Sequence, residues 1–232
     1  MTRNAAVGTA LSEAPLELDL ELVPIVPFYV KTPSEEFRTL RTRLEQLQAT
    51  RLIQTVLVAS LSPGDGKSFI AANLALAEAQ LADNPTLLCD FDLRSPTLHT
   101  VFQIHRSPGI SDYLLGAADL HESMRRIGNS NLFVMPAGQA TVNPLELLHL
   151  KEASRLVHQL RNAFRCILLD SPPLSVASDA HLLARLADGA LLVARIGATT
   201  RDSMNRAIGS LGQDRILGIV ANRTPPNADS CF

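Results

Sequence analysis

Short apolar runs alternate along the chain with longer stretches that have the apolar spacing of helices. The runs have the length and the β-branched content of buried strands. They fall near 55–60, 86–91, 132–135, 166–170, 190–195 and 216–221. Strands that alternate with helices predict an α/β fold with a mostly parallel central sheet and helices on both faces.

The segment before the first strand predicts one more helix. Ser34 is a suitable N-cap, and acidic residues follow it in the first turn. One apolar stripe at helical spacing contains Phe37, Leu40, Leu44 and Leu47. Further upstream, apolar and acidic residues alternate over 16–22 before Pro24 and Pro27. This alternation suits an added edge strand, a docking segment or a loosely ordered leader, and we treat 1–32 as a partly flexible leader.

The turn after the first strand carries the clearest chemistry. Gly64 and Gly66 permit a tight turn whose N–H groups face an anion, and the helix that begins near Lys67 adds its positive end. Lys67 would hold the β- and γ-phosphates, and the Ser68 hydroxyl would ligate magnesium. Leu61 stands where the general phosphate-loop pattern has its first glycine. A simple connecting turn is disfavoured, because Gly-x-Gly-Lys-Ser follows a strand and opens a helix.

Two later strands end in carboxylates. Alternation places Asp90 and Asp92 on one side of an extended chain, where one could orient a metal and the other accept a proton from a hydroxyl or water. Arg94 would neutralise phosphate or pair with one of these aspartates. Asp170 ends the strand at 166–170, the position of a second magnesium ligand in a parallel sheet. The three segments together predict a magnesium-nucleotide site.

These segments resemble the motifs of the bacterial tyrosine kinases (BY-kinases), P-loop ATPases that govern capsule and exopolysaccharide assembly. Residues 63–68 resemble their Walker A motif, whose first position is not restricted to glycine. Residues 90–99 resemble Walker A′, and 170–173 resemble Walker B. Further likenesses lie at 109–116, 136–138, 143–148 and 218–223. The resemblance runs from about residue 33 to residue 223.

The resemblance implies ATP and Mg²⁺ as cofactors of a protein tyrosine kinase. Catalytic roles are implied for Lys67, Asp90, Asp92 and Arg94, with Asp90 accepting the tyrosine proton. Magnesium would be held by Ser68, Asp92 and Asp170. Nucleotide contacts are implied for Pro63, Gly64, Asp65, Gly66, Lys67, Ser68, Phe69, Asn222 and Arg223.

Partners are implied in the same way. Glu35, Arg38 and Arg41 resemble the E-x-x-R-x-x-R motif through which BY-kinase domains pack into rings, although a solvated face with weak i,i+3 pairs is the alternative. The family resemblance further implies a membrane adaptor of the polysaccharide co-polymerase type and a protein tyrosine substrate in trans. The chain would be cytoplasmic and recruited to the inner face of the plasma membrane by that adaptor.

The tyrosines set this chain apart from the family pattern. BY-kinases usually end in a tyrosine cluster, whereas this chain has Tyr29 and Tyr113 and none in its short tail at 225–232. Tyr113 is expected to pack within a short helix. A second hypothesis is therefore a non-kinase ATPase switch of the septum-positioning or partition type, which dimerises on ATP and uses water as the acceptor. A nucleotide-binding scaffold without turnover has no positive support, because the acidic groups are all present.

Composition limits the domain organisation, partners and location that the chain can have. A chain of 232 residues that is 46% hydrophobic can bury one core, expected at 33–224. A net charge of −2 without a basic cluster argues against nucleic acid as the main partner. There is no apolar run of transmembrane length and no signal peptide pattern, which favours a cytosolic chain. Cys89 and Cys166 are expected to be buried thiols rather than metal ligands.

Overall fold

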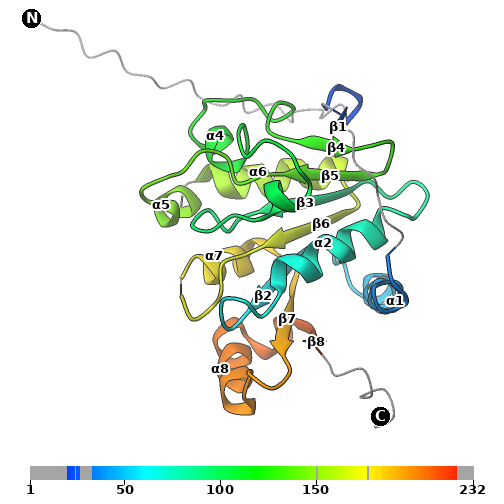
Figure 1. Ribbon diagram of the computed structural model, residues 1–232, viewed down its shortest axis with the longest axis vertical. Coiled ribbons are helices and arrows are strands. Elements are labelled where there is room, and N and C mark those ends of the chain that lie inside the picture. Colours follow the sequence, from blue (N-terminus) through cyan, green and yellow to red (C-terminus); the bar gives the residue numbers. More distant parts are fainter. Residues whose placement is uncertain (1–19, 24, 27–32, 150, 177, 224–232) are drawn as a thin grey trace, which may run out of the picture.

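A single twisted sheet lies between two layers of helices in the computed structural model, which describes residues 20–23, 25–26, 33–149, 151–176 and 178–223 (Figure 1). The strand order is β1-β4-β5-β3-β6-β2-β7-β8. The strands are β1 (Ile25–Val26), β2 (Thr55–Ser60), β3 (Thr86–Asp90), β4 (Arg125–Ile127), β5 (Leu132–Met135), β6 (Cys166–Asp170), β7 (Gly189–Arg195) and β8 (Ile216–Asn222). Neighbours from β5 to β8 pair in parallel, whereas β4 pairs antiparallel with β5. The predicted α/β fold with a mostly parallel sheet is confirmed.

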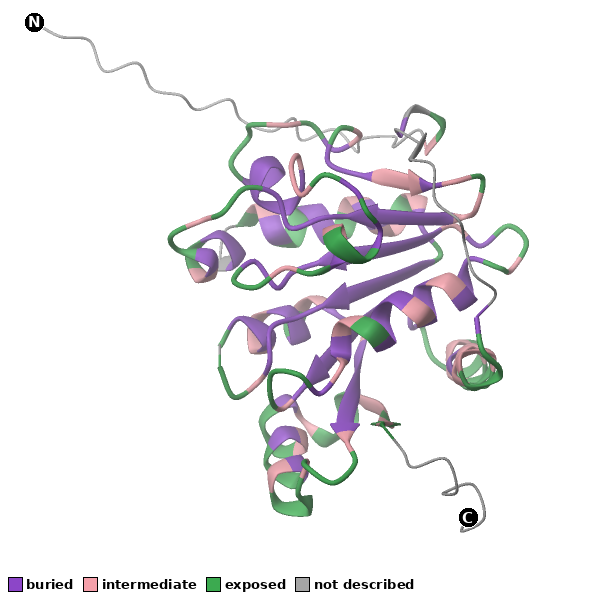
Figure 2. Ribbon diagram, viewed as in Figure 1, coloured by how far each residue is buried: buried purple, intermediate pink, exposed green. Residues whose placement is uncertain are grey.

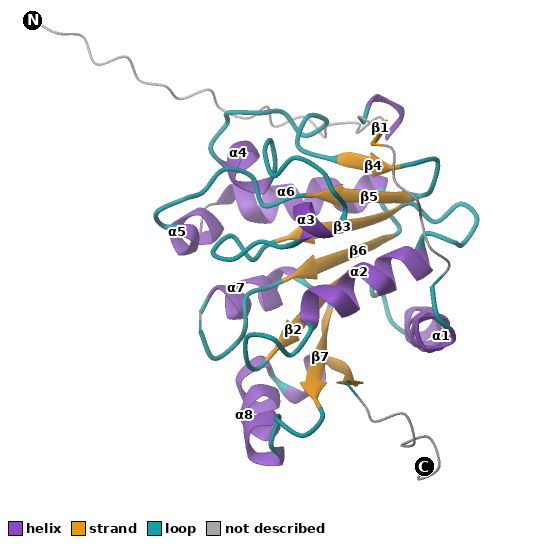
Figure 3. Ribbon diagram, viewed as in Figure 1, coloured by secondary structure: helices purple, strands orange, loops and turns teal. Residues whose placement is uncertain are grey.

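Helices cover both faces of this sheet (Figure 3). The helices are α1 (Glu35–Thr50), α2 (Lys67–Glu78), α3 (Leu98–Val101), α4 (Ile110–Leu114), α5 (Pro144–His149), α6 (Lys151–Ala163), α7 (Asp179–Leu186) and α8 (Arg201–Leu211), with 3-10 turns η1 (Leu20–Leu22) and η2 (Gln213–Arg215). Alternate strand residues pack into two separate clusters, one with α1 to α3 and one with α4 to α8. Because successive strand side chains point to opposite faces, Val56 and Val58 join the first cluster and Leu57 joins the second.

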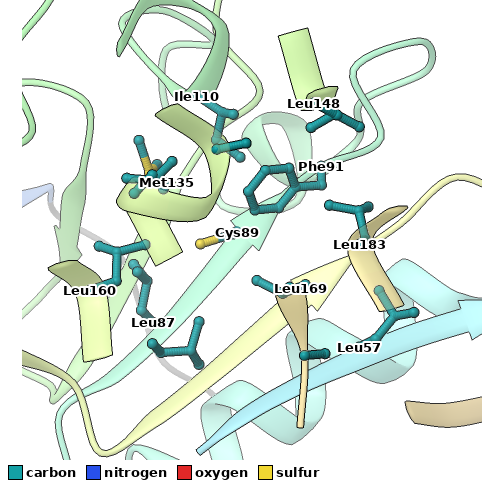
Figure 4. Packing of buried hydrophobic residues seen from close by; sticks show 14 of the residues in the cluster. Leu57, Leu87, Cys89, Phe91, Ile110, Met135, Leu148, Leu160, Leu169 and Leu183 are labelled. Atoms are coloured by element: carbon teal, nitrogen blue, oxygen red, sulfur yellow. The ribbon is translucent and has the colours of Figure 1, made fainter. Parts of the chain in front are cut away.

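The sheet interior is almost wholly apolar. The central strands are buried along their length, and exposed residues collect in loops and on outer helix surfaces (Figure 2). Phe91, which directly follows β3, packs with Cys89, Ile110 and Leu148 in the cluster that contains α4 to α8 (Figure 4). Cys89 and Cys166 are free buried thiols, as expected. Tyr113 is buried and its hydroxyl donates a hydrogen bond of 2.8 Å to Gln159 Oε1, which confirms its packing role.

The first helix follows its predicted pattern with one difference. Leu44 is buried, and the other three members of the apolar stripe pack against the same cluster. Ser34 occupies the N-cap position, but its hydroxyl bonds the Glu36 carboxylate and caps no backbone N–H. The first-turn N–H groups of Phe37 and Arg38 instead bond the Ser34 carbonyl.

The far edge of the sheet holds two short strands that the sequence did not reveal. β4 adds antiparallel to β5, and β1 pairs in parallel with β4 at Ile25 and Val26. This part of the leader therefore forms an edge strand, and Val23 beside it is buried. Residues 1–19, 24 and 27–32 of the leader, Tyr29 among them, and the tail at 225–232 lie outside the described residues. Within the described ranges, no helix is long and apolar enough to cross a membrane.

Candidate functional site

The phosphate loop connects β2 to α2 at the carboxyl edge of the sheet. Gly64 and Gly66 adopt the left-handed φ values of +80° and +96°, which residues with a Cβ rarely adopt. Asp65 closes the turn, because its carboxylate accepts a hydrogen bond of 2.8 Å from the N–H of Ser62. Helix α2 begins directly at Lys67, so its unpaired N-terminal N–H groups open onto the loop.

The last strand contacts this loop closely. Asn222 ends β8, and its side-chain amide donates a hydrogen bond of 2.7 Å to the Asp65 carbonyl. A Cβ on Gly66 would lie 2.0 Å from the Asn222 amide nitrogen, so only glycine fits there as the side chains now lie. Arg223 follows in the left-handed region at φ 59°. The structure thus brings 63–68 and 222–223 together from distant parts of the chain.

Lys67 lies among three carboxylates, from the end of β3, from the segment that follows it and from the end of β6. Its ammonium Nζ is 3.0 Å from Asp92 Oδ2 and 3.7 Å from Asp170 Oδ1. Asp90 is near enough to add to the same electrostatic interaction. Ser68 is adjacent, with its Oγ 3.2 Å from the Lys67 ammonium. The structure therefore brings together Lys67, Ser68 and the three aspartates that the sequence proposed for the site.

The two aspartates of Walker A′ have different local roles. β3 ends at Asp90, whose Oδ2 accepts hydrogen bonds of 3.1 and 3.0 Å from the N–H groups of Thr97 and Leu98. Asp92 lies beyond the strand, and its Oδ1 accepts from the N–H of Ser95 at 3.0 Å while Oδ2 faces Lys67. Strand alternation predicted that both would reach the site, but it did not predict that Asp90 also holds the start of α3.

Burial dominates the electrostatics of this cluster. It raises the pKa of Asp90, and the neighbouring Asp170 charge raises that pKa further. Burial also raises the pKa of Asp170, against the opposing effect of the Lys67 ammonium. For Lys67, burial lowers the pKa, but the surrounding carboxylates outweigh it and the net shift is upward. The lysine is therefore held charged, and the inner carboxylates hold protons more tightly than exposed ones do.

Arg94 has a partner that the sequence did not indicate. Its guanidinium pairs with Asp179, the first residue of α7, with Nε–Oδ2 at 2.9 Å and Nη2–Oδ1 at 3.3 Å. The expectation that Arg94 pairs with an aspartate of its own motif is therefore wrong. Asp179 is almost fully buried. A helix start after Ser178 was detectable locally, but no local signal connects Asp179 to a residue 85 positions away.

A pocket of about 340 Å³ lies beside this cluster, and Lys67, Asp92 and Arg94 line it. Its walls are the phosphate loop with Lys67 and Ser68, the 92–97 segment after β3, and Pro172, Pro173 and Val176 after β6. Phe69 lies at the rim, more than half exposed, with its ring edge-on to Phe37 at 5.8 Å between centroids.

The pocket could hold a hard cation only together with a ligand. Asp170 Oδ1 and Oδ2 and Asp90 Oδ1 are buried without hydrogen-bond partners. Such oxygens, with the Ser68 hydroxyl, suit Mg²⁺. Within the described ranges, no group of three or more His, Cys, Asp or Glu residues forms a ready metal cage. A metal held by one or two carboxylates and by phosphate oxygens needs no such cage.

The three residues expected to mediate self-association, Glu35, Arg38 and Arg41, do not all face the solvent. Arg38 and Glu35 form an exposed ion pair at 3.0 Å. Arg41 instead turns toward α2, where it donates a hydrogen bond of 3.1 Å to the Ala77 carbonyl and lies 3.6 Å from Glu45. The three residues therefore do not form one free charged stripe.

Comparison with known proteins gives a consistent set of relatives, although no family model matches the chain. Tyrosine-protein kinase YwqD of Bacillus subtilis is 34% identical over 191 residues, which are 82% of this chain and 80% of that protein. Putative tyrosine-protein kinase CapB of Staphylococcus aureus is 30% identical over 215 residues, 90% of this chain and 94% of that protein. The crystal structure of the chimerical protein CapA2B2 superposes with a TM-score of 0.78 at 31% identity, over 84% of this chain and 87% of that one.

More distant structures share the fold alone. The septum site-determining protein MinD of Pyrococcus horikoshii, complexed with Mg-ADP, superposes with a TM-score of 0.63 at 19% identity over 75% of each chain. The sheet and its covering helices are therefore an arrangement that this chain shares with more distant proteins.

Proposed function

The chain belongs to the bacterial tyrosine kinases, and we propose that it transfers the γ-phosphate of ATP to protein tyrosines in the control of exopolysaccharide or capsule synthesis and export. The observation that carries this proposal is the convergence of three carboxylates on Lys67 of the phosphate loop. Binding phosphate requires only the loop and the lysine. The additional carboxylates provide the groups that hold a metal and activate an acceptor hydroxyl.

We assign the metal ligands to Ser68, Asp92 and Asp170. The buried oxygens of Asp170, which have no hydrogen-bond partner and lie near the Lys67 ammonium, support this assignment. Bound Mg²⁺ would supply neutralisation of the charge on the transferring phosphate. The chain itself contributes Lys67 as a fixed positive charge and the N-terminus of α2 as an anion site.

Asp90 is the proposed acceptor of the tyrosine proton. Its pKa is raised by burial, and a base works best when its pKa lies near the working pH. One of its oxygens is fixed by the N–H groups that it holds in α3, while Oδ1 has no hydrogen-bond partner. That oxygen has no competing hydrogen bond, and it is the atom that would accept the proton. Phosphoryl transfer would then rest on positioning and charge neutralisation by groups already in place.

The nucleotide is proposed to lie along the loop from Pro63 to Phe69, with its base toward Asn222 and Arg223. Strand order supports this direction, because β8 with Asn222 lies on one side of β2 and the carboxylates after β6 and β3 lie on the other. The phosphate tail would therefore point toward the carboxylates.

The proposals for assembly and location rest on the family resemblance. We propose a kinase domain at 33–224, between a leader at 1–32 and a short tail at 225–232. A membrane adaptor of the polysaccharide co-polymerase type would recruit it to the inner face of the plasma membrane, in keeping with the CapA2B2 chimera as a relative. Copies would associate through Glu35, Arg38 and Arg41, of which the first two are exposed. Substrate tyrosines would be supplied in trans.

A transfer assay tests the function directly. The purified chain is incubated with Mg²⁺, γ-labelled ATP and a tyrosine-rich peptide, with and without a candidate adaptor tail. We expect label on tyrosine in the wild type and loss of about 100-fold or more of the rate in Asp90→Asn. The amide oxygen of asparagine can still accept from the N–H groups of Thr97 and Leu98, so this variant separates proton transfer from folding.

The same assay can overturn the proposal. Release of free phosphate without phosphotyrosine, with or without the adaptor tail, would replace the kinase with an ATPase switch of the septum-positioning or partition type. A thermal denaturation curve of Asp90→Asn that matches the wild type shows that loss of transfer is chemical rather than structural.

A further inference from the structure

The acceptor side of the pocket follows from the order of the strands. The phosphate loop follows β2, and the segments after β6 and β3 lie successively on one side of it. Asp170, Asp92 and Asp90 all belong to that side, so the end of the nucleotide that reacts lies there. Any group that accepts phosphate must therefore enter between the segment after β3 and the segment after β6.

The walls of this entrance differ in chemistry. One wall is apolar, with Pro172, Pro173 and Val176, and Val176 is 59% exposed. The backbone of this wall is fixed, because the N–H groups of Leu174 and Ser175 bond the carbonyls of Ser60 and Leu61. A water acceptor would gain nothing from an exposed apolar surface beside the phosphate site. The aromatic ring of a tyrosine acceptor could pack against it.

The opposite wall carries Arg94, whose side chain is 42% exposed. The two N–H groups that contact Asp179 lie along the edge of the guanidinium. A guanidinium held by its edge keeps its flat faces free, and those faces stack on aromatic rings. Asp179 itself is only 1% exposed and cannot reach a ligand directly.

The Arg94–Asp179 pair also joins the two walls. Arg94 belongs to the segment after β3, and Asp179 begins α7 immediately after the apolar wall. A buried carboxylate with a two-point contact to arginine holds its partner in a narrow range of positions. The pair therefore fixes how far apart the walls lie at the entrance.

We infer that the acceptor tyrosine ring lies between Arg94 and Val176, and that Asp179 is the positioning residue that orients Arg94 for this contact. The inference rests on the proposed function and adds the residues that select an aromatic acceptor. Asp179 acts through Arg94 and touches neither the phosphate nor the metal ligands.

Steady-state kinetics with the adaptor-activated wild type and Asp179→Asn tests this inference. The KM for a tyrosine peptide should rise about tenfold, because acceptor binding is weakened, while kcat at saturating peptide changes much less. The KM for ATP should stay near its wild-type value. A matched control is Asp188→Asn, at a second, partly exposed Asp–Arg pair, Asp188 with Arg161 at 2.7 Å, away from the nucleotide pocket. That control should leave the peptide KM unchanged even where it lowers stability.

A double-mutant cycle keeps the test independent of folding. If Asp179 acts through Arg94, Arg94→Ala and Arg94→Ala with Asp179→Asn should have the same peptide KM, so the two effects are not additive. Val176→Asp, at an exposed position, should also raise the peptide KM about tenfold by placing a charge against the ring. Compared with Arg94→Ala, Arg94→Lys should recover less than half of the lost affinity for the tyrosine peptide, because an ammonium lacks the planar edge and faces of a guanidinium.

The outcomes separate the two proposals. A wild-type chain that never labels tyrosine overturns the kinase function and this inference with it. A wild-type chain that labels tyrosine, with unchanged peptide KM in Asp179→Asn and Val176→Asp, overturns the inference alone. Equal increases in the KM values for ATP and peptide in Asp179→Asn would also overturn it. They would show that Asp179 stabilises the whole pocket rather than orienting Arg94 for the acceptor.

Discussion

At the scale of single residues, the site is organised around one buried cation. Lys67 balances Asp92 and Asp170 at 3.0 and 3.7 Å, and the burial that raises the pKa of the inner carboxylates makes this balance necessary. A nucleotide would bring further negative charge to the same place. The lysine must therefore neutralise charge on both the protein carboxylates and the phosphates, and a bound metal would neutralise part of the same charge.

Replacing the lysine should remove nucleotide binding. In Lys67→Met the phosphates would face Asp92 and Asp170 with no fixed positive charge, so ATP affinity should fall about 100-fold or more. Titration of a fluorescent ATP analogue with Mg²⁺ measures this. Lys151→Met, at an exposed lysine of α6, is the control and should bind as the wild type does. Unchanged affinity in Lys67→Met would contradict the phosphate-loop assignment.

At the scale of elements, α1 and α2 are joined by charged groups at the end of α2 that lies away from the nucleotide. Arg41 of α1 bonds the Ala77 carbonyl, one of the last carbonyl groups of α2. Glu78 follows it and is 1% exposed, with Oε2 near the Asn84 amide and Oε1 without a partner. Burial, and next the charge of Glu45, raise its pKa from 4.5 to about 7, while Asn84 and Arg41 oppose the shift.

This glutamate should make stability depend on pH. Because its pKa is higher in the folded chain than in the unfolded chain, the folded chain binds more protons between about pH 4.5 and 7. Its contribution to stability therefore falls as the pH rises through this range. Glu78→Gln, which cannot ionise, should be more stable than the wild type at pH 8 by on the order of 1–3 kcal/mol and nearly equal at pH 4.5.

Urea denaturation at the two pH values measures this difference. Glu146→Gln, at an exposed position on α5, should differ from the wild type by less than about 0.5 kcal/mol at both. A wild type and Glu78→Gln that unfold at the same urea concentration at pH 8 would refute the role of Glu78.

The two arginines of α1 should separate assembly from stability. Arg38→Ala removes only an exposed i,i+3 pair and should change stability by less than about 0.5 kcal/mol, but it should lower the oligomer mass measured by light scattering with the adaptor tail. Arg41→Ala loses the hydrogen bond to the Ala77 carbonyl of α2 as well as its charge, and should lower the free energy of unfolding by about 1–2 kcal/mol. Unchanged assembly in both variants would exclude this helix face as the interface.

At the scale of the whole molecule, the site depends on strands that are distant in sequence. Strand order places β6 and β7 on either side of β2, so residues near 60, 92, 170 and 222 converge on one edge. The contact between Gly66 and Asn222 joins the phosphate loop to the last strand. Nucleotide binding at the loop therefore requires that β8 has joined the sheet.

Adding a methyl group at this contact should test that dependence. Gly66→Ala introduces both a strained φ of +96° and a clash with Asn222, and ATP affinity should fall more than about tenfold. Gly64→Ala has a similar φ of +80° but no atom within 4 Å, so it measures the strain alone. Isothermal titration with ATP compares the two. Gly66→Ala with Asn222→Ala should recover the part due to the clash, and equal losses in both single variants would exclude the contact.

The sequence by itself determined six of the described strands, the phosphate loop and the family. These features are encoded locally: short continuous apolar runs mark buried strands, and a glycine turn before a helix marks an anion site. The predicted strands near 55–60, 132–135 and 166–170 agree with β2, β5 and β6. The nature of the relatives also followed from the motifs, because each motif lies within a few consecutive residues.

Only the tertiary structure decided which partner each polar side chain takes. Arg94 pairs with Asp179 rather than with an aspartate of its own motif, Asp90 holds the start of α3, and Arg41 turns inward to Ala77. Ile25 and Val26 join the sheet through β4, although the preceding alternation left the leader undecided. Such pairs depend on the order of strands and on the packing of helices, which bring distant residues together. A local pattern specifies the element on which a side chain lies, but not the neighbour that it meets.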